Sequence, residues 1–122
     1  MNDYIPTLKL RVLPPDEKNL YQIAELDGDM DKAGLDIVKD KLEKLAENFP
    51  CKFFVFDLSA LNYINSESIG FLMALHSHLV KMKKVLVITS ARSNVKDVLS
   101  VIGILGVIEY YDSVDDFKKK IV

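Results

Sequence analysis

The stretch Asp57–Gly70, DLSALNYINSESIG, begins inside the apolar run Lys52–Leu58 and decides how this chain folds. A continuous apolar run of this kind predicts a central strand covered on both faces, with Asp57 at its carboxyl end. Ser59–Asn65 then leads out of the strand. An apolar period of about 3.6 residues starts near Ser66 and predicts a largely buried helix. Strand, polar turn and helix together indicate an α/β domain.

The residues before this stretch predict two strands and then a helix. Thr7–Leu13 alternates apolar and polar side chains, and Asn19–Leu26 has the composition of a second strand, which Gly28 is expected to end. A stripe of apolar residues at helical spacing follows, made of Leu35, Val38, Leu42, Leu45 and Phe49. Pro50 is expected to stop this helix.

The residues after Gly70 continue the alternation. Strands are expected over Lys83–Thr89 and Val107–Tyr111, and the helix between them should be capped by Ser93 or Asn94. Gly103 closes that helix, because glycine readily adopts the left-handed conformation at a helix end.

A C-terminal helix is expected to begin with a capping box formed by Ser113 and Asp116. The predicted order is therefore β-β-α-β-α-β-α-β-α, in one α/β domain over residues 1–122. Alternating strands and helices imply right-handed crossovers and a mostly parallel sheet with helices packed on it. The opening β-β step implies an outer strand that joins by a short turn and can run antiparallel, so the sheet is mixed.

The composition excludes several classes of protein. The 122 residues are 49% hydrophobic, enough for one core without disulfide or metal staples. The net charge is −2 with both signs spread along the chain, which argues against a nucleic-acid partner. No apolar run approaches the ~20 residues of a membrane helix, and Met1–Leu10 lacks the pattern of a signal peptide. A cytoplasmic protein with no membrane partner is expected.

Few residues in the chain indicate an enzyme. His76 and His78 are two residues apart on a predicted helix, so they point in different directions and cannot share a metal. The lone Cys51 adjoins a strand without a plausible base, and no phosphate-binding loop or nucleophile elbow is present. We therefore predict a protein that is not an enzyme, with no cofactor and no metal.

Asn65, Ser66, Glu67 and Ser68 gather at the predicted start of a helix. Helix N-termini present unpaired N–H groups and partial positive charge, which suit an anion. A serine there has two interpretations. Its hydroxyl can cap the helix, or it can accept a phosphate. The spacing of the residues does not decide between them.

Four landmarks in the chain match one family in order. They are Glu25–Met30 (L-x-G-x-[LI/M]), Phe56–Ser59 (D-L-S), Tyr63–Gly70 ([FY]-[IM]-D-S-[ST]-G-[LI]-G), and the tail Val98–Leu99, Gly103–Ile104, Val107–Ile108, Ser113 and Phe117. The run Glu25–Ile121 thus resembles the STAS domain of bacterial anti-sigma-factor antagonists, with a motif-bearing core over about residues 19–121.

This resemblance implies roles for particular residues. Ser66 takes the place of the serine that is phosphorylated by a kinase-type anti-sigma factor, and a serine phosphatase would reset it. Asn65–Ser68 would bind that partner, while Asp57, Ser59 and Gly70 complete the motif. The implied function is an anti-sigma-factor antagonist that serine phosphorylation switches off.

The chain departs from the family motif at three positions. Asn65 stands where the family usually has Asp, which removes a negative charge beside Ser66. Glu67 replaces a small hydroxyl residue and adds a charge that would repel a phosphate. Ser68 replaces Gly and is expected to limit how closely a partner backbone can approach.

Two other functions remain open. One is a STAS partner-binding subunit of another signalling or lipid-transport complex. The other is a response-regulator receiver phosphorylated on Asp57, with Thr89 as its hydroxyl residue and Asp16-Glu17 as its acidic pair. The strand-strand-helix opening argues against a receiver, as does the lack of a lysine in the segment Glu109–Asp112 after the last strand.

Overall fold

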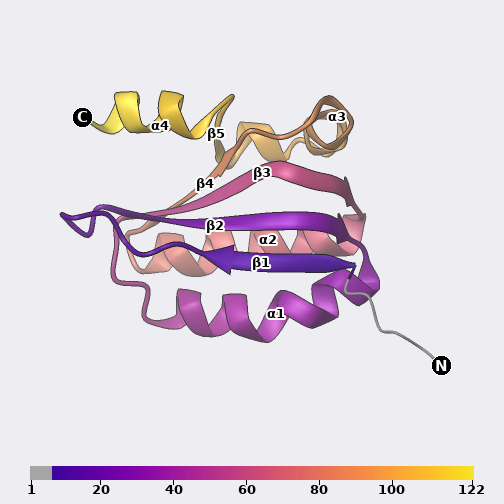
Figure 1. The fold of residues 1–122 in the computed structure, drawn as a ribbon, viewed down its shortest axis with the longest axis horizontal. Helices are drawn as coiled ribbons and strands as arrows, with labels where there is room; N and C mark the ends of the chain where they lie inside the picture. Colours follow the sequence, from indigo (N-terminus) through magenta and orange to yellow (C-terminus); the bar gives the residue numbers. More distant parts are fainter. Residues whose placement is uncertain (1–6) are drawn as a thin grey trace.

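The computed structural model describes residues 7–122, which form one mixed sheet with helices on both of its faces (Figure 1). The strands are β1 (Leu8–Val12), β2 (Tyr21–Met30), β3 (Phe53–Ile64), β4 (Val85–Thr89) and β5 (Glu109–Tyr111). The helices are α1 (Lys32–Glu47), α2 (Ser66–Lys81), α3 (Ser93–Ile102) and α4 (Val114–Ile121), with a 3-10 turn, η1, at Ile104–Gly106. Residues 1–6, which include most of the segment expected to lack a leader, lie outside the described residues.

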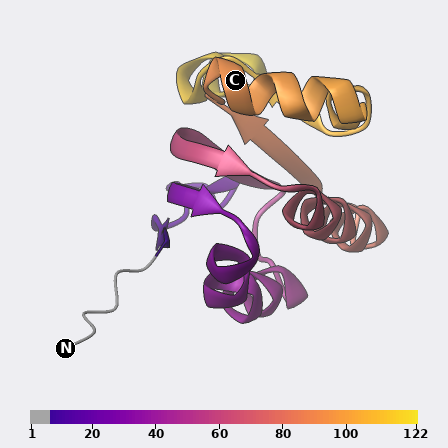
Figure 2. The same ribbon diagram turned by 90° about the vertical axis from the view of Figure 1, so that its right-hand side faces the viewer.

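The topology confirms the predicted fold class. The strand order in space is β1-β2-β3-β4-β5, with β1 antiparallel to β2 and the other neighbours parallel. Helices α1 and α2 pack against one face, and α4 lies on the other (Figure 2). Because each helix returns the chain to start a parallel strand, α1 and α2 both begin at the carboxyl end of the sheet.

Two hydrophobic clusters hold these layers together. The larger one joins α1, α2 and α3 to the sheet, and the smaller one lies beneath α4 around Phe117. Phe117 is fully buried, and its ring makes edge contacts with Tyr21, Phe53 and Tyr111 at centroid distances of 5.3–5.7 Å. Such aromatic edge contacts add to area burial, so this residue fixes α4 across the starts of β2 and β3.

The prediction that Gly28 ends the second strand is wrong, because β2 continues to Met30. Gly28 has φ +119°, and a Cβ there would lie 2.3 Å from the Thr7 carbonyl oxygen. Only glycine tolerates both conditions. The pairing with β3 shifts register on both sides of this point, so glycine allows β2 to bulge and continue.

Strand β3 is also longer than predicted, and Asp57 is not at its carboxyl end. The strand runs to Ile64, but β4 pairs with it only from Phe53 to Asp57. Beyond Asp57, β3 pairs with β2 alone and passes through two register shifts. The apolar run ends where β3 ceases to be buried on both of its faces. The strand itself continues, with one face exposed, to Ile64.

Side chains at the start of α3 satisfy part of the unpaired edge of β3. Arg92 Nε donates to the Ser59 carbonyl oxygen at 2.9 Å, and Arg92 Nη1 also donates to Asn62 Oδ1. Asn94 Nδ2 donates to the Asn62 carbonyl oxygen at 2.8 Å. The prediction that Ser93 or Asn94 caps α3 is therefore wrong. Arg92 occupies the cap position without a side-chain cap bond.

The other helix ends behave largely as predicted. Gly103 closes α3 in the left-handed conformation with φ +87°, and Ser113 Oγ accepts from the Asp116 N–H at 3.0 Å to cap α4. Helix α1 ends at Glu47, shortly before Pro50.

Candidate functional site

The site forms where β3 ends and α2 begins, and Asn65 is the residue that caps α2. Asn65 Oδ1 accepts from the Ser68 N–H at 2.8 Å, and the Asn65 N–H donates to the Met30 carbonyl oxygen at 3.1 Å. The amide thus satisfies one free donor of the first helical turn, as an N-cap does. The backbone N–H of Asn65 also fixes the turn to the end of β2.

Ser68 lies inside the domain. It is fully buried, and its Oγ donates to the same Met30 carbonyl oxygen at 2.8 Å. The hydroxyl therefore anchors the first turn of α2 to β2. The resemblance implies that Ser68 belongs to a partner-binding surface, but its side chain is buried and is not exposed for such a contact.

Ser66 is the first residue of α2, and it is exposed. Its hydroxyl makes no hydrogen bond to any residue of the range 7–122. Because Asn65 supplies the cap, the cap interpretation of Ser66 does not hold. What remains is an accessible hydroxyl beside the partial positive charge of a helix N-terminus.

Gly70 lies one helical turn after Ser66, on the same face of α2. It is exposed, and a Cβ at this position would meet nothing within 4 Å. The packing of the described residues therefore does not require glycine here. Tyr63 is half exposed near the end of β3, three residues before Ser66.

Glu67 points to the other side of the turn. It is exposed and borders an open groove of about 650 Å³ between α1 and α2. Phe71 and Leu75 belong to the apolar floor of this groove, and Lys39 and Lys44 to its rim. Glu67 therefore adds negative charge close to Ser66 without sharing its face of the helix.

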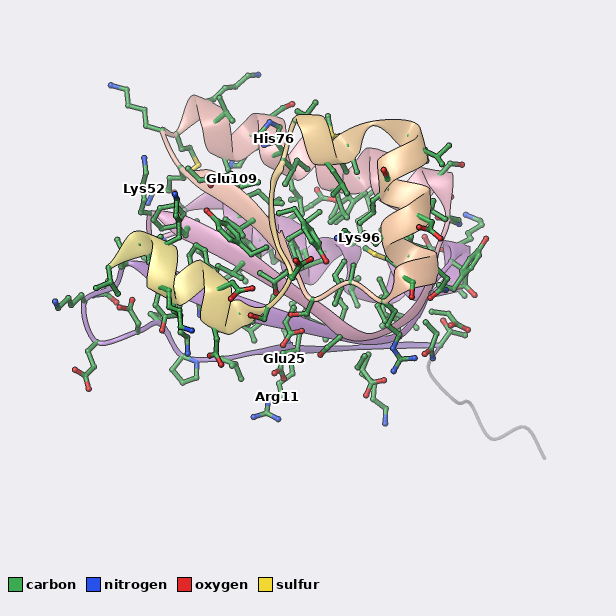
Figure 3. The ribbon with its side chains drawn as sticks, turned by 90° about the horizontal axis from the view of Figure 1, so that it is seen from above. Arg11, Glu25, Lys52, His76, Lys96 and Glu109 are labelled. Carbon is green, nitrogen blue, oxygen red and sulfur yellow. The ribbon has the colours of Figure 1, made fainter. Side chains whose placement is uncertain are left out.

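Asp57 and Ser59 do not join this site. They line a separate shallow depression of about 280 Å³, with Arg11 and Glu25 across from them. Arg11 and Glu25 form an ion pair at 3.6 Å there (Figure 3). Asp57 Oδ1 accepts from the Ser59 N–H at 3.0 Å. Seven residues of strand, roughly 20 Å, separate Asp57 from Ile64 at the end of β3.

The groups that a receiver domain needs have other roles here, although Asp57 and Thr89 are register partners on β3 and β4. Thr89 is buried, and its hydroxyl donates to the Phe56 carbonyl oxygen at 3.0 Å. Asp16 accepts from the backbone N–H groups of Tyr21 and Leu20 in the β1–β2 turn, and the bond from Tyr21 is the largest cause that lowers its pKa. Each residue has a structural role of its own, and Asp57 is not at a strand end.

The two histidines of α2 lie in different environments. His76 is half-buried, whereas His78 is exposed with Nε2 3.1 Å from the Ala46 carbonyl oxygen. Across residues 7–122 no group of His, Cys, Asp and Glu side chains is arranged to hold a metal ion. In the same range, no helix has both the length and the apolar character needed to cross a membrane.

A comparison with protein-family models matches residues 16–117 to the STAS domain. The chain belongs to the STAS family. The match covers most of the chain and includes residues 65–70 at the N-terminus of α2. The landmarks that the sequence offered in Tyr63–Gly70 therefore led to the correct family despite the departures at Asn65, Glu67 and Ser68.

Solved structures support the same fold at low sequence identity. An anti-sigma-factor antagonist from Mycobacterium paratuberculosis superposes with a TM-score of 0.78 at 19% identity, covering 89% of each chain. A STAS domain protein from Planctomyces limnophilus gives 0.76 at 13% identity, covering 93% of this chain and 97% of that one. The Bacillus cell fate determinant SpoIIAA in its phosphorylated form gives 0.67 at 10%, covering 94% and 99%. No curated protein matches this chain.

The sequence did not predict the polar side chains that bond to the last part of β3, just before the N-terminus of α2. Arg92, Asn62 and Asn94 brace the last part of β3, which leads directly into α2. A helix cap was the role expected for Asn94, and none was expected for Arg92. They bond to β3 where it continues beyond the end of β4, and this extension leaves no pattern in the sequence.

Proposed function

We propose that this STAS domain is an anti-sigma-factor antagonist. Its unphosphorylated form binds a kinase-type anti-sigma factor in the cytoplasm and so releases a sigma factor. Phosphorylation of Ser66 by that partner ends the binding, and a serine phosphatase restores it. The domain is the substrate in this cycle and not the catalyst, and it needs no cofactor of its own.

The exposed hydroxyl of Ser66 is the observation that carries the proposal. Of the two serines in the first turn of α2, it is the one that a kinase can reach, and the cap it might have provided comes from Asn65. The relatives add support by their descriptions, since the Mycobacterium paratuberculosis protein, the Planctomyces limnophilus protein and SpoIIAA are all described as anti-sigma-factor antagonists. SpoIIAA also exists in a phosphorylated form.

Gly70 supports a partner surface on the same face of α2. Glycine inside a helix costs roughly 1 kcal/mol relative to alanine. The described residues offer no packing reason for that cost, because the space beyond Gly70 is open. A partner that lies close to the helix beside Ser66 would provide the reason. Tyr63 and Asn65 would lie at the edge of that contact.

The chemistry of the switch is a phosphoryl transfer. The Ser66 oxygen would bond to the γ-phosphorus of ATP, the bond from phosphorus to the β–γ bridging oxygen would break, and ADP would leave as the hydroxyl proton is lost. The product carries about −1.5 to −2 charges at a surface where the partner had covered a neutral hydroxyl. Glu67 adds repulsion nearby, so both charges act against the complex.

The test is phosphorylation by a kinase-type anti-sigma factor, purified with the domain from native cytosol. We expect ATP to label Ser66, and Ser66→Ala to remove the label. Ser68→Ala is the matched control, because its hydroxyl is buried and should not be a substrate in the folded domain.

Three outcomes would contradict the proposal. Label on Ser59 or Ser68 would move the switch elsewhere, and a purified partner without kinase activity would favour a STAS subunit of another assembly. A stoichiometric acyl phosphate formed from acetyl phosphate and lost in Asp57→Asn would favour the receiver function.

A further inference from the structure

Eight lysines from distant parts of the sequence lie at the end of the sheet where β2, β3 and β4 begin. Lys18 belongs to the β1–β2 turn, and the others adjoin strand starts or helix ends. This group is called the basic end and consists of Lys18, Lys52, Lys81, Lys83, Lys84, Lys118, Lys119 and Lys120.

Contacts between the segments establish that these residues share one end. The Lys52 N–H donates to the Leu20 carbonyl oxygen at 3.0 Å, and the Lys52 carbonyl accepts from Val85 at 2.9 Å. Lys118 Nζ lies 5.8 Å from the centroid of the Tyr21 ring. In Figure 3, Lys52 lies beside the end of α4, at the same end of the molecule as the C-terminus marked in Figure 1.

None of the lysines of the basic end takes part in an ion pair with another described residue, and two of them bond to carbonyl groups. Lys52 Nζ donates to the Lys83 carbonyl oxygen at 2.9 Å, and Lys84 Nζ donates to the Phe49 carbonyl oxygen. A carbonyl orients an ammonium group and leaves its full charge. The ion pairs found among residues 7–122 all involve other cations, namely Arg11, Lys32 and Lys96.

The charge of the chain is therefore strongly divided. Three carboxylates, those of Asp16, Glu17 and Glu47, lie at the same end, which leaves an excess of five positive charges. The whole chain carries −2, so the remainder carries −7. Helix C-termini favour nearby cations, and this accounts for Lys81 and for the lysines of α4. Lys83 and Lys84 follow the same end of α2, but a helix end does not account for Lys18 in the β1–β2 turn or for Lys52 before β3.

We propose that the basic end binds the surface of a membrane rich in anionic lipid. All eight cations are lysines, which act as point charges on flexible stems and suit a diffuse negative surface. The ring of Phe49 is buried, and the half-buried ring of Tyr21 contacts Phe117 and Lys118, so neither offers a free platform for stacked bases. Exposed Pro50 and half-buried Met82 lie among the lysines and provide small apolar contacts.

This binding would leave Ser66 and the N-terminus of α2 free for a partner, because α2 begins at the opposite end of the sheet. The sequence predicted no membrane partner, because it contains no apolar run of membrane-helix length and no signal-peptide pattern. The fold brings eight lysines together at one end of the sheet, which a count of charges along the sequence does not detect.

The test is co-sedimentation with vesicles. We expect the protein to bind vesicles that contain phosphatidylglycerol, to ignore vesicles of phosphatidylcholine alone, and to dissociate as salt rises. The variant Lys81→Gln/Lys83→Gln/Lys119→Gln should bind at least about tenfold more weakly, because each lysine near such a surface changes partitioning roughly fivefold. The matched control Lys9→Gln/Lys39→Gln/Lys41→Gln removes the same charge elsewhere and should bind within about twofold of the parent.

Absence of vesicle binding would overturn the proposal, as would an equal loss in both triple variants. Tighter binding to a DNA duplex than to the anionic vesicles at the same salt would assign the basic end to nucleic acid instead. Ser66→Ala should bind vesicles like the parent, so the result does not depend on the proposed switch.

Discussion

Ser66 and Ser68 are two residues apart in the first turn of α2, yet the structure places them in opposite environments. Ser66 is exposed and its hydroxyl is unbonded within the described chain, whereas Ser68 is buried and donates to Met30. Asn65 lies before both and caps the turn. Within a single helical turn, one serine thus anchors the helix and another remains accessible, because a third side chain supplies the cap.

The same substitution at both serines should have the largest difference in effect. Ser68→Asp would bury a carboxylate without a partner and direct it at a carbonyl oxygen, which should cost at least about 3 kcal/mol of folding stability. Ser66→Asp should instead stabilise the domain by about 0.3–1 kcal/mol, because it places an exposed acid at a helix N-terminus. Urea unfolding of each variant measures both effects.

The two variants should also separate in partner binding. Ser66→Asp should bind the anti-sigma factor more weakly than the parent while remaining folded, since one charge imitates part of a phosphate. Equal stability losses for the two variants would show that the serines do not occupy different environments.

Removal of the Asn65 cap, which lies before both serines, should have an intermediate effect on folding stability. Asn65→Ala leaves the Ser68 N–H without its acceptor and should lower stability by about 1 kcal/mol. Asn65→Asp is the control, because a carboxylate accepts the same bond and should keep or slightly raise the melting temperature. If Asn65→Ala melted like the parent, the cap bond would contribute nothing to the turn.

Gly70→Ala should have the smallest effect on the fold and the opposite sign. Alanine fits the open space and should stabilise α2 by up to about 1 kcal/mol. Partner binding should weaken nevertheless, because the new methyl group lies on the face shared with Ser66. Ser100→Ala, a small change at an exposed position of α3, is the control for binding. A Gly70→Ala domain that gained stability and bound normally would remove Gly70 from the interface.

The sequence predicted the order of the elements, the antiparallel first strand and the start of α2 at Ser66. These features depend on hydrophobic period and on turn residues, which are local. It did not predict the length of β3, because the strand continues through polar residues such as Ser59 and Asn62 where only β2 pairs with it. Nor did it predict which serine is accessible, since exposure depends on Met30 at the end of another strand.

The unpaired side of β3 also bears on how the domain avoids self-association. A free strand edge is a template for another chain, and most sheets protect theirs. The outer strands here are short, five residues in β1 and three in β5. The long strands lie inside the sheet, except where β3 extends beyond β4. There Arg92 and Asn94 occupy the carbonyl groups of Ser59 and Asn62, so a foreign strand would have to displace two side chains before it could pair beside Ser66.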